Sequence, residues 1–361
     1  MRLTVAGCRK RQGLLLSRIS PLGVEVAVLA DPKHVLYLTG YQTPDAMESA
    51  AVLRDSGKCI LVAPPCDEDL AVDEYIVYEP SFLYSLRLDQ PLAVAQKVDG
   101  ILDSTRRPAG LDKGGASGLL GELVKGAVDL DPVLAEMRRA KDEDELAIMK
   151  KAIDVTHSCY ARAREIIEPG ITELEVYTEL YGTAVKDAGE KLPALGNDFQ
   201  CNSPGGAPRD RRTKAGELYI LDLGVCLAGY HADNSRTFAV DGEPDEFQHA
   251  AWSDICEVFS MVEEEVSPGV SCTELFEAVK SFLDIRWPGS FNHHLGHGVG
   301  LNPHEMPNLN PHWKHSFQEG DLFTVEPGIY GPKLRGGIRL EENYLVTSDG
   351  VEKLTSFPLD L

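Results

Sequence analysis

Residue types that bind divalent metals are concentrated in four short motifs in the second half of this sequence. The motifs are LDLGVCLAGYHADNSRTF at 221–238, HHLGHGVGLNPHE at 293–305, TVEPGIY at 324–330 and GIRLEEN at 337–343. They contain Asp222, Asp233, His297, Glu326 and the adjacent pair Glu341 and Glu342. Four carboxylates with one imidazole suit two divalent ions about 3.5–4 Å apart, which activate a water molecule held between them. The motifs are therefore typical of a metallohydrolase.

The first motif predicts a β-hairpin that carries two of these carboxylates. Residues 217–225 alternate as a strand, and residues 230–240 alternate as its return. With a turn centred near residues 227–228, Asp222 lies directly opposite Asp233, and both side chains are on one face of the hairpin. Two like charges at this distance destabilise a sheet unless a cation lies between them. We therefore expect this pair to hold a metal ion.

The other three motifs supply an imidazole and further carboxylates. Four histidines occur within residues 293–304, and glycines on both sides of His297 allow a ligand to approach closely. Glu326 ends a predicted strand that begins at residue 321. A second predicted strand, over residues 337–347, places Glu341 and Glu342 on opposite faces, so only one of them can be a ligand. The alternation alone does not choose between them.

Length and composition exclude several classes of protein. The chain has 361 residues, of which 43% are hydrophobic and 25% are charged, and this suits a globular protein of two domains. Its net charge of −22 argues against a nucleic-acid partner, which requires basic surface. No apolar run approaches the ~18 residues that span a membrane. The eight cysteines are scattered without a paired motif, which favours reduced thiols and a cytoplasmic location.

The chain is predicted to form two domains, of residues 1–138 and 142–361. The boundary lies in residues 136–144, which are charged and poor in apolar side chains. The first part alternates strands and helices, with a strand over 24–30, a hairpin over 51–63, and helices over 92–102 and 118–128. In the second part helices are expected over residues 143–168, 172–189, 244–266 and 272–284. The predicted fold class is therefore α/β (α+β).

These motifs, in this order, resemble the creatinase/prolidase/aminopeptidase-P (M24-type) family of metallopeptidases. The resemblance covers residues 142–361 and extends weakly to residues 31–41. It implies a small α/β, creatinase-like amino-terminal domain followed by a pita-bread catalytic domain with a curved, mostly antiparallel sheet. It also implies a homodimer in which the amino-terminal domain of one subunit borders the active site of the other, with residues 37–41 at that border.

The resemblance further assigns an activity and its residues. The family's five metal ligands fall on Asp222, Asp233, His297, Glu326 and Glu341, and the family's pattern at the last motif favours Glu341 over Glu342. His293 and His304 match two histidines that contact substrate and tetrahedral intermediate, and Glu326 takes a proton as well. The implied enzyme is an Xaa-Pro aminopeptidase or dipeptidase that uses a metal-bridging hydroxide to cleave a small peptide. Two ions of Mn, Co, Zn or Fe suit its site.

One loop departs from the family pattern. Family peptidases carry a histidine before the first metal strand, whereas residues 202–212 (NSPGGAPRDRR) contain none. The nearest counterparts are Arg209 and Asp210, and a guanidinium there is expected to hold a substrate carboxylate. This departure leaves open a non-peptidase of the same fold, a C–N hydrolase or lyase that acts on a small carboxylate-bearing metabolite. A binding module without enzymatic activity is a further alternative, against which the complete ligand set counts.

Overall fold

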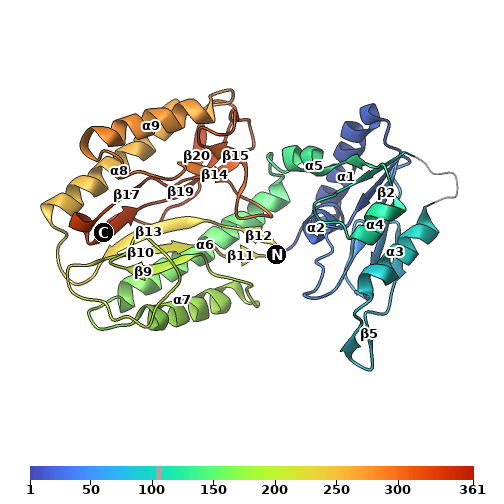
Figure 1. The fold of residues 1–361 in the computed structure, drawn as a ribbon, viewed down its shortest axis with the longest axis horizontal. Coiled ribbons are helices and arrows are strands. Elements are labelled where there is room, and N and C mark those ends of the chain that lie inside the picture. The colour runs from blue at the N-terminus through green and yellow to red at the C-terminus, as the bar shows by residue number, and fades with distance from the viewer. Residues whose placement is uncertain (103–107) are drawn as a thin grey trace. The chain divides into compact units, whose positions relative to one another are not determined.

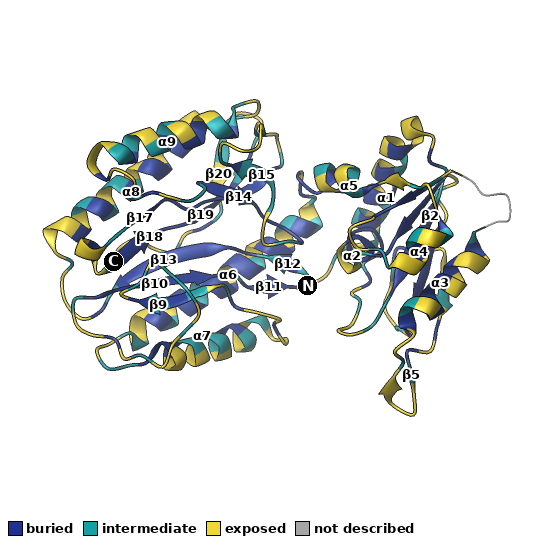
Figure 2. Ribbon diagram, in the orientation of Figure 1, coloured by how far each residue is buried: buried dark blue, intermediate teal, exposed yellow. Residues whose placement is uncertain are grey.

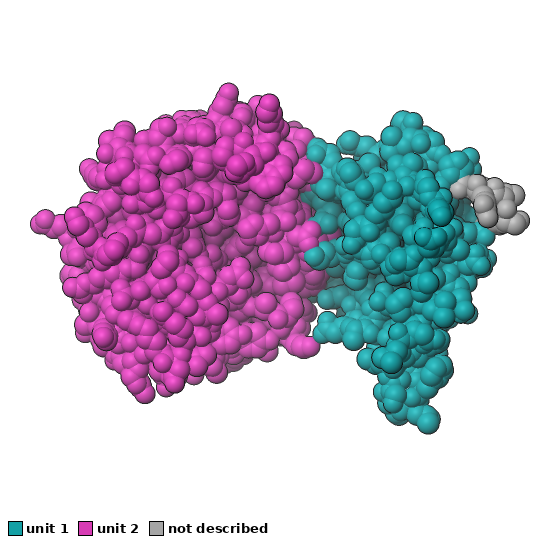
Figure 3. Space-filling view, viewed as in Figure 1, with its two compact units in different colours: residues 1–138 teal, residues 139–361 magenta. Residues whose placement is uncertain are grey.

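The structure is a computed structural model that describes residues 1–102 and 108–361. It contains two compact units, unit 1 (Met1–Arg138) and unit 2 (Arg139–Leu361), which Figure 3 shows in two colours. The division falls inside the charged segment 136–144. In the described ranges, no helix has both the length and the apolar character needed to cross a membrane.

Unit 1 is built around a mixed β-sheet with the strand order β4-β3-β2-β1-β7-β8 (Figure 1). Its strands are β1 (Val26–Leu29), β2 (Ala50–Arg54), β3 (Cys59–Ala63), β4 (Glu74–Val77), β7 (Ala109–Leu111) and β8 (Val128–Asp129). The hairpin predicted over residues 51–63 is confirmed as antiparallel β2 and β3. A separate short hairpin consists of β5 (Ser81–Phe82) and β6 (Ser85–Leu86).

Helical segments precede, connect and follow the strands of this sheet. They are α1 (Val5–Ile19), the 3-10 turn η1 (Ser20–Leu22), α2 (Pro32–Thr39), α3 (Gln90–Ile101), α4 (Gly118–Leu123) and α5 (Asp131–Met137). Apolar residues of α3 and α4 join alternate residues of β1, β2 and β3 in one core, because alternate strand positions face the same side. The helix predicted over residues 118–128 is shorter than expected, since the chain leaves α4 after Leu123 and enters β8.

Residues 37–41, expected at a subunit border, are buried inside unit 1. Tyr37 and Tyr41 are 1% and 3% exposed. The Tyr37 hydroxyl donates to the carbonyl oxygen of Met137 at 3.2 Å, and the guanidinium of Arg11 lies over its ring. These two side chains belong to the core of their own unit, and the expectation that residues 37–41 border a partner subunit stays a prediction.

Unit 2 contains two antiparallel sheets. One has the order β13-β10-β9, and the other has the order β15-β14-β16-β19-β20. The strands of the first are β9 (Asp198–Cys201), β10 (Leu218–Leu223) and β13 (Asn234–Ala239), and those of the second are β14 (Gly296–Gly298), β15 (Glu305–Leu309), β16 (Leu322–Val325), β19 (Glu342–Val346) and β20 (Val351–Lys353). Two short hairpins complete the unit: β11 (Cys226–Leu227) with β12 (Tyr230–His231), and β17 (Gly328–Gly331) with β18 (Gly336–Arg339), the latter joined through the 3-10 turn η2 (Pro332–Leu334).

Helix pairs lie on either side of these strands (Figure 1). The pair α6 (Glu143–Ile166) and α7 (Glu173–Ala188) lies on one side, and the pair α8 (Glu246–Glu265) and α9 (Cys272–Arg286) lies on the other. Figure 2 shows that the helices turn a buried face to the strands and an exposed face outward, as their apolar spacing predicts. Capping boxes at Asp142, Thr172 and Asp245 begin three of these helices. All four predicted helices of this part are confirmed.

Candidate metal centre

Five side chains from the four sequence motifs meet among the strands of unit 2. Asp222 comes from β10, Asp233 precedes β13, His297 lies in β14, Glu326 follows β16, and Glu341 lies between β18 and β19. Their donor atoms form two sets, and the atoms of each set lie within 4.8 Å of one another. One set contains Asp222, Asp233 and Glu341, and the other contains His297, Glu326 and Glu341. All five side chains are buried, and the two sets share Glu341. The arrangement offers two adjacent positions for cations.

The pairing of the first two carboxylates differs from the prediction. Asp222 pairs with Ser235 rather than with Asp233, because the hairpin turns at Ala228-Gly229. Both turn residues have left-handed backbones, with φ of 46° and 86°, as a tight type I′ turn requires. The register therefore moves by two residues. A two-residue shift keeps both carboxylates on one face, as diagonal rather than direct neighbours.

The long strand predicted over residues 337–347 is also broken. β18 pairs with β17, whereas β19 pairs with β16, and the chain passes between these partners at Leu340 and Glu341. The carboxylate of Glu341 belongs to the candidate centre. The carboxylate of Glu342 accepts from Nη2 of Arg236 at 3.0 Å and also from the Thr355 hydroxyl. The two neighbours thus have different partners, and only Glu341 lies with the other donors.

The donor set has the chemistry that a divalent cation requires. Oδ1 of Asp222 and both carboxylate oxygens of Glu341 are buried without a hydrogen-bond partner among the described residues. Burial, together with neighbouring carboxylates, raises the pKa of Asp233 and Glu341 well above the ordinary range. Burial likewise raises the pKa of Asp222 to about 6. Buried carboxylates without partners are costly unless a cation compensates them, so these residues fit divalent metal ions.

Glu326 and His297 form a buried pair of opposite charges. Burial opposes ionisation of both side chains, but their mutual hydrogen bond and charges dominate, lowering the pKa of Glu326 to about 2 and raising that of His297 to about 9. The Nε2 atom of His297 lies 3.3 Å from Oε1 of Glu326 and 3.7 Å from Oδ2 of Asp233. Its Nδ1 atom donates to the carbonyl oxygen of Gly298 at 2.9 Å, which leaves Nε2 free to act as a metal donor.

Two other predicted histidines lie beside these donors. The ring of His304 stacks on that of His297, and its donor atom also lies in a set with His297 and Asp233. Burial and the neighbouring imidazoles lower the pKa of His304 to about 4. His293 donates from Nδ1 to the carbonyl oxygen of His294 at 2.7 Å, so its Nε2 accepts from the Tyr330 hydroxyl at 2.9 Å.

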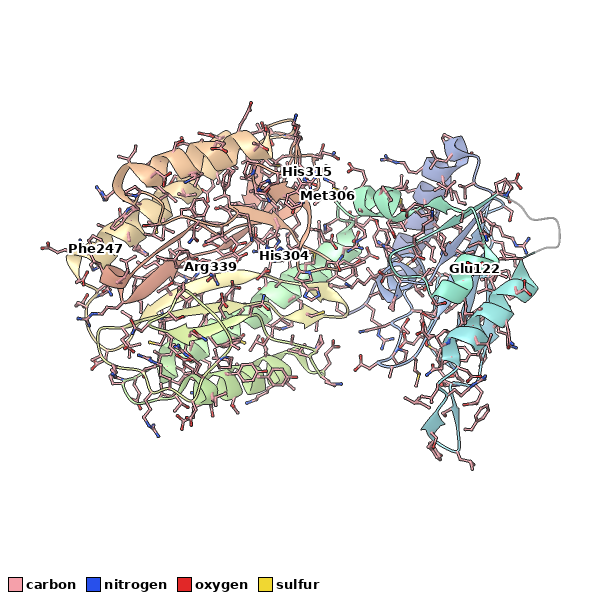
Figure 4. The ribbon with its side chains drawn as sticks, in the orientation of Figure 1. Glu122, Phe247, His304, Met306, His315 and Arg339 are labelled. Atoms are coloured by element: carbon pink, nitrogen blue, oxygen red, sulfur yellow. The ribbon has the colours of Figure 1, made fainter. Side chains whose placement is uncertain are left out.

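Sequence reasoning missed a basic residue at this centre. Arg339 donates from Nη2 to Oδ2 of Asp222 at 2.7 Å and to Oδ2 of Asp198, and from Nη1 to the Tyr330 hydroxyl at 3.2 Å. It therefore links a candidate ligand to the Tyr330–His293 pair. Figure 4 labels Arg339 among the strands of unit 2, between its helix pairs. Strand alternation was the available signal, since Arg339 precedes Glu341 by two residues.

The predicted substrate-binding arginine forms an ion pair within unit 2. Arg209 donates from Nε to Oε2 of Glu173 at 2.8 Å and from Nη2 to Oε1 of the same carboxylate at 2.6 Å. Glu173 is fully buried at the start of α7, so this pair neutralises an internal charge. The neighbouring Arg211 pairs with Glu217 in the same way. The guanidinium of Arg209 is thus engaged by Glu173, and substrate binding by Arg209 and by the exposed Asp210 stays a prediction.

A cavity of about 510 Å³ adjoins the candidate centre. Its lining includes Phe276 and Lys280 from α9, Phe291, His312, His293 and His294. The Nδ1 atom of His294 lies 3.4 Å from Oε1 of Glu326, so this part of the lining touches the donor set. No Asp or Glu is among the described lining residues, in contrast to the donor set itself.

The chain matches the model of metallopeptidase family M24 over residues 147–348, more than half of its length. It belongs to metallopeptidase family M24. An Xaa-Pro dipeptidase of Pyrococcus furiosus is 30% identical over 308 residues, which cover 80% of this chain and 86% of that protein. An Xaa-Pro dipeptidase of Pyrococcus horikoshii is 28% identical over 348 residues, or 94% of each chain.

A solved structure shows that the similarity extends to the fold of nearly the whole chain. The prolidase of Pyrococcus horikoshii OT3 superposes with a TM-score of 0.82 at 24% identity, covering 98% of this chain and 99% of the other. The predicted α/β class with mostly antiparallel sheets in a pita-bread arrangement is confirmed. Membership of the family identifies the chain as a metallopeptidase that requires divalent metal ions.

Proposed function

We propose that this chain is an Xaa-Pro peptidase that uses two divalent metal ions to release an amino-terminal residue before proline. The observation that carries this proposal is the pair of donor sets that share Glu341. The names of the two Pyrococcus relatives support the substrate class. They do not favour the alternatives of a metabolite C–N hydrolase or lyase, or of a binding module without activity.

The donor sets indicate which residues would hold each ion. Asp222, Asp233 and Glu341 would hold one, and His297, Glu326 and Glu341 the other. When bound, divalent ions supply Lewis acidity toward the scissile carbonyl and a water molecule. Of the possible ions we expect manganese first, because most donor atoms of the site are oxygens and manganese favours such hard ligands.

The chain's own residues would complete the reaction. Glu326 would accept a proton from water, as a carboxylate of the donor set whose Oε1 lies 3.3 Å from Nε2 of His297. His304 lies beside the donors and would direct an N–H group to the oxyanion that develops during attack. Both ring nitrogens of His293 already have partners, so His293 would contact the substrate without donating to the oxyanion. Tyr330 and Arg339 hold His293 in one orientation.

Electrostatics gives the bound peptide a direction. The carboxylates of the donor set attract the cationic amino end of a peptide. The described lining of the cavity contains no carboxylate, and burial lowers the pKa of its His293 and His294, so the cavity repels a carboxylate less than the donor set does and is the better place for the carboxyl side. The substrate would therefore place its first residue at the donor set and its remainder in the cavity.

Assembly and location are part of the same proposal. We expect a homodimer, because Leu83 and Tyr84 at the tip of the β5–β6 hairpin are 97% and fully exposed, and apolar tips of this kind are usually covered by a partner. Light scattering should give twice the chain mass of 39.5 kDa, and a monomer at micromolar concentration would contradict this. A cytoplasmic location is supported by the eight cysteines, all within the described residues, each of which is a free thiol.

The test of the proposed function is a matched pair of dipeptides. Protein stripped of metal by a chelator should be inactive, and Mn, Co, Zn or Fe should restore hydrolysis of Ala-Pro but not of Ala-Ala. The variant Glu326→Gln should bind the dipeptide without cleaving it. If the added metal ions bind to the protein but none of them restores turnover of Ala-Pro, the Xaa-Pro assignment is wrong and a non-peptide substrate must be sought.

A further inference from the structure

A fully buried arginine lies directly behind the candidate metal centre. Arg236, in β13, is 1% exposed and touches none of the cavity. Its Nε donates to the carbonyl oxygen of Pro358 at 3.0 Å. Its Nη1 donates to the carbonyl oxygens of Ser235 at 2.9 Å and of Glu341 at 2.6 Å. Its Nη2 donates to Oε1 of Glu342 at 3.0 Å and to the carbonyl oxygen of Phe357 at 2.7 Å.

This contact set uses the whole guanidinium. A guanidinium has five N–H donors in a fixed planar fork, and each one of Arg236 has an acceptor. The Glu342 carboxylate compensates the charge of the guanidinium. The ring centroids of Tyr160 and Phe357 lie 5.9 and 6.0 Å from Cζ of Arg236. A lysine could satisfy at most three of these acceptors and would leave the others buried without a donor.

One of these acceptors belongs to a candidate metal ligand. The main-chain N–H of Glu341 donates to the carbonyl oxygen of Ser235 at 3.0 Å, and its carbonyl oxygen accepts from Arg236 and from Nδ2 of Asn234. The carboxylate of Glu341 has no hydrogen-bond partner among the described residues. In the protein alone, therefore, the position of this carboxylate is set by the backbone that Arg236 and Asn234 hold, and not by contacts of the side chain itself.

The same arginine also binds the backbone of residues 357 and 358. Besides the two carbonyl contacts, the indole N–H of Trp252 donates to the carbonyl oxygen of Leu359 at 2.8 Å. Outside them, Arg164 pairs with Asp360 at the surface. The segment thus forms one side of the pocket in which Arg236 lies.

We propose that Arg236 is a positioning residue of the metal centre, which joins residues 357–358 to the backbone of Glu341 and so sets metal affinity. The inference rests on the proposed metal centre but concerns a residue that touches neither metal nor substrate. Partners behind the ligands of a metal site typically contribute about 10–100-fold to metal affinity. We expect a loss in that range when the guanidinium is replaced.

The experiment measures binding of Mn²⁺ alone by calorimetry to metal-free protein, together with thermal unfolding of the same samples. Arg236→Lys should bind Mn²⁺ about 10–100-fold more weakly than the wild type. The matched control is Arg139→Lys. Arg139 is also buried in unit 2 and bonds Asp321 and the carbonyl oxygen of Ser316, neither of which is a candidate ligand. The control should lose thermal stability and keep wild-type metal affinity.

Each outcome decides one question. Wild-type affinity in Arg236→Lys, or an equal loss in Arg139→Lys, would overturn the positioning role. If Arg236→Lys does not fold, Phe357→Leu provides the test, because it removes a ring beside the guanidinium and keeps every carbonyl acceptor. It should weaken Mn²⁺ binding by a smaller factor, and unchanged affinity would again count against the inference. Failure of the wild-type protein to bind Mn²⁺ or any other divalent ion would instead contradict the proposed function.

Discussion

The ring of His304 lies flat against the ring of His297, with centroids 3.7 Å apart and planes inclined by 11°. One histidine belongs to a donor set that contains Glu326 and Glu341, and the other lies at the more exposed side of the site. The two rings are in contact, but only His297 shares a donor set with Glu326 and Glu341, so variants of each imidazole test their roles separately.

The first prediction separates a ligand from an oxyanion donor. His297→Ala should lose at least one bound metal ion, because it removes the only nitrogen of its donor set. His304→Ala should keep its metal content and lose about 10²–10³-fold in kcat, the usual effect of removing one such donor. Metal analysis and steady-state kinetics on Ala-Pro provide the measurement. Loss of metal from His304→Ala would show instead that His304 is a ligand.

The second prediction contrasts two adjacent glutamates. Glu341→Gln should abolish tight metal binding and yet raise the thermal stability of the metal-free protein at neutral pH. The reason is that burial raises the pKa of the Glu341 carboxyl well above its ordinary range, so the wild type must take up a proton there on folding, which glutamine does not require. Glu342→Gln should lower that stability by about 1–3 kcal/mol, because it weakens the ion pair with Arg236. Unfolding of chelator-treated samples would check both signs. A less stable metal-free Glu341→Gln would contradict the argument.

The third prediction concerns the arginine that pairs with Glu173. Arg209→Ala should destabilise the protein by about 1–3 kcal/mol, because it leaves a buried carboxylate unpaired. The double variant Arg209→Ala with Glu173→Gln should recover part of that loss. The KM for Ala-Pro should hardly change in soluble Arg209→Ala. A large rise in KM without a loss of stability would restore a substrate-binding role for Arg209.

The fourth prediction is a pH dependence of stability in the metal-free protein. Burial, with a contribution from the charge of Arg236, lowers the pKa of His157 below its ordinary value. The folded state therefore favours the neutral ring, and the unfolded chain takes up a proton first as the pH falls below about 6.5. The contribution to stability is complete above that pH and declines below it as far as the folded pKa. Urea unfolding at pH 7.5 and 5.5 should show a smaller difference for His157→Gln than for the wild type, and equal differences would refute this assignment.

Local patterns in the sequence determined much of the protein. Residue types and spacing indicated the donor residues, because carboxylates and imidazoles in short motifs have few other uses together. Apolar periodicity and capping residues located the helices of unit 2 to within a few residues, since both are properties of one element at a time. The choice of Glu341 over Glu342 was beyond local pattern and depended on the family resemblance.

Only the tertiary structure decided which groups became partners. The left-handed pair Ala228-Gly229 moved the hairpin register by two residues, and a turn type is not set by the strand alternation around it. Arg209 pairs with Glu173, 36 residues away in the sequence, and Arg236 donates to carbonyl oxygens more than a hundred residues away. A buried guanidinium takes whichever acceptors the fold brings within hydrogen-bond distance, and long-range contacts of this kind leave no period in the sequence.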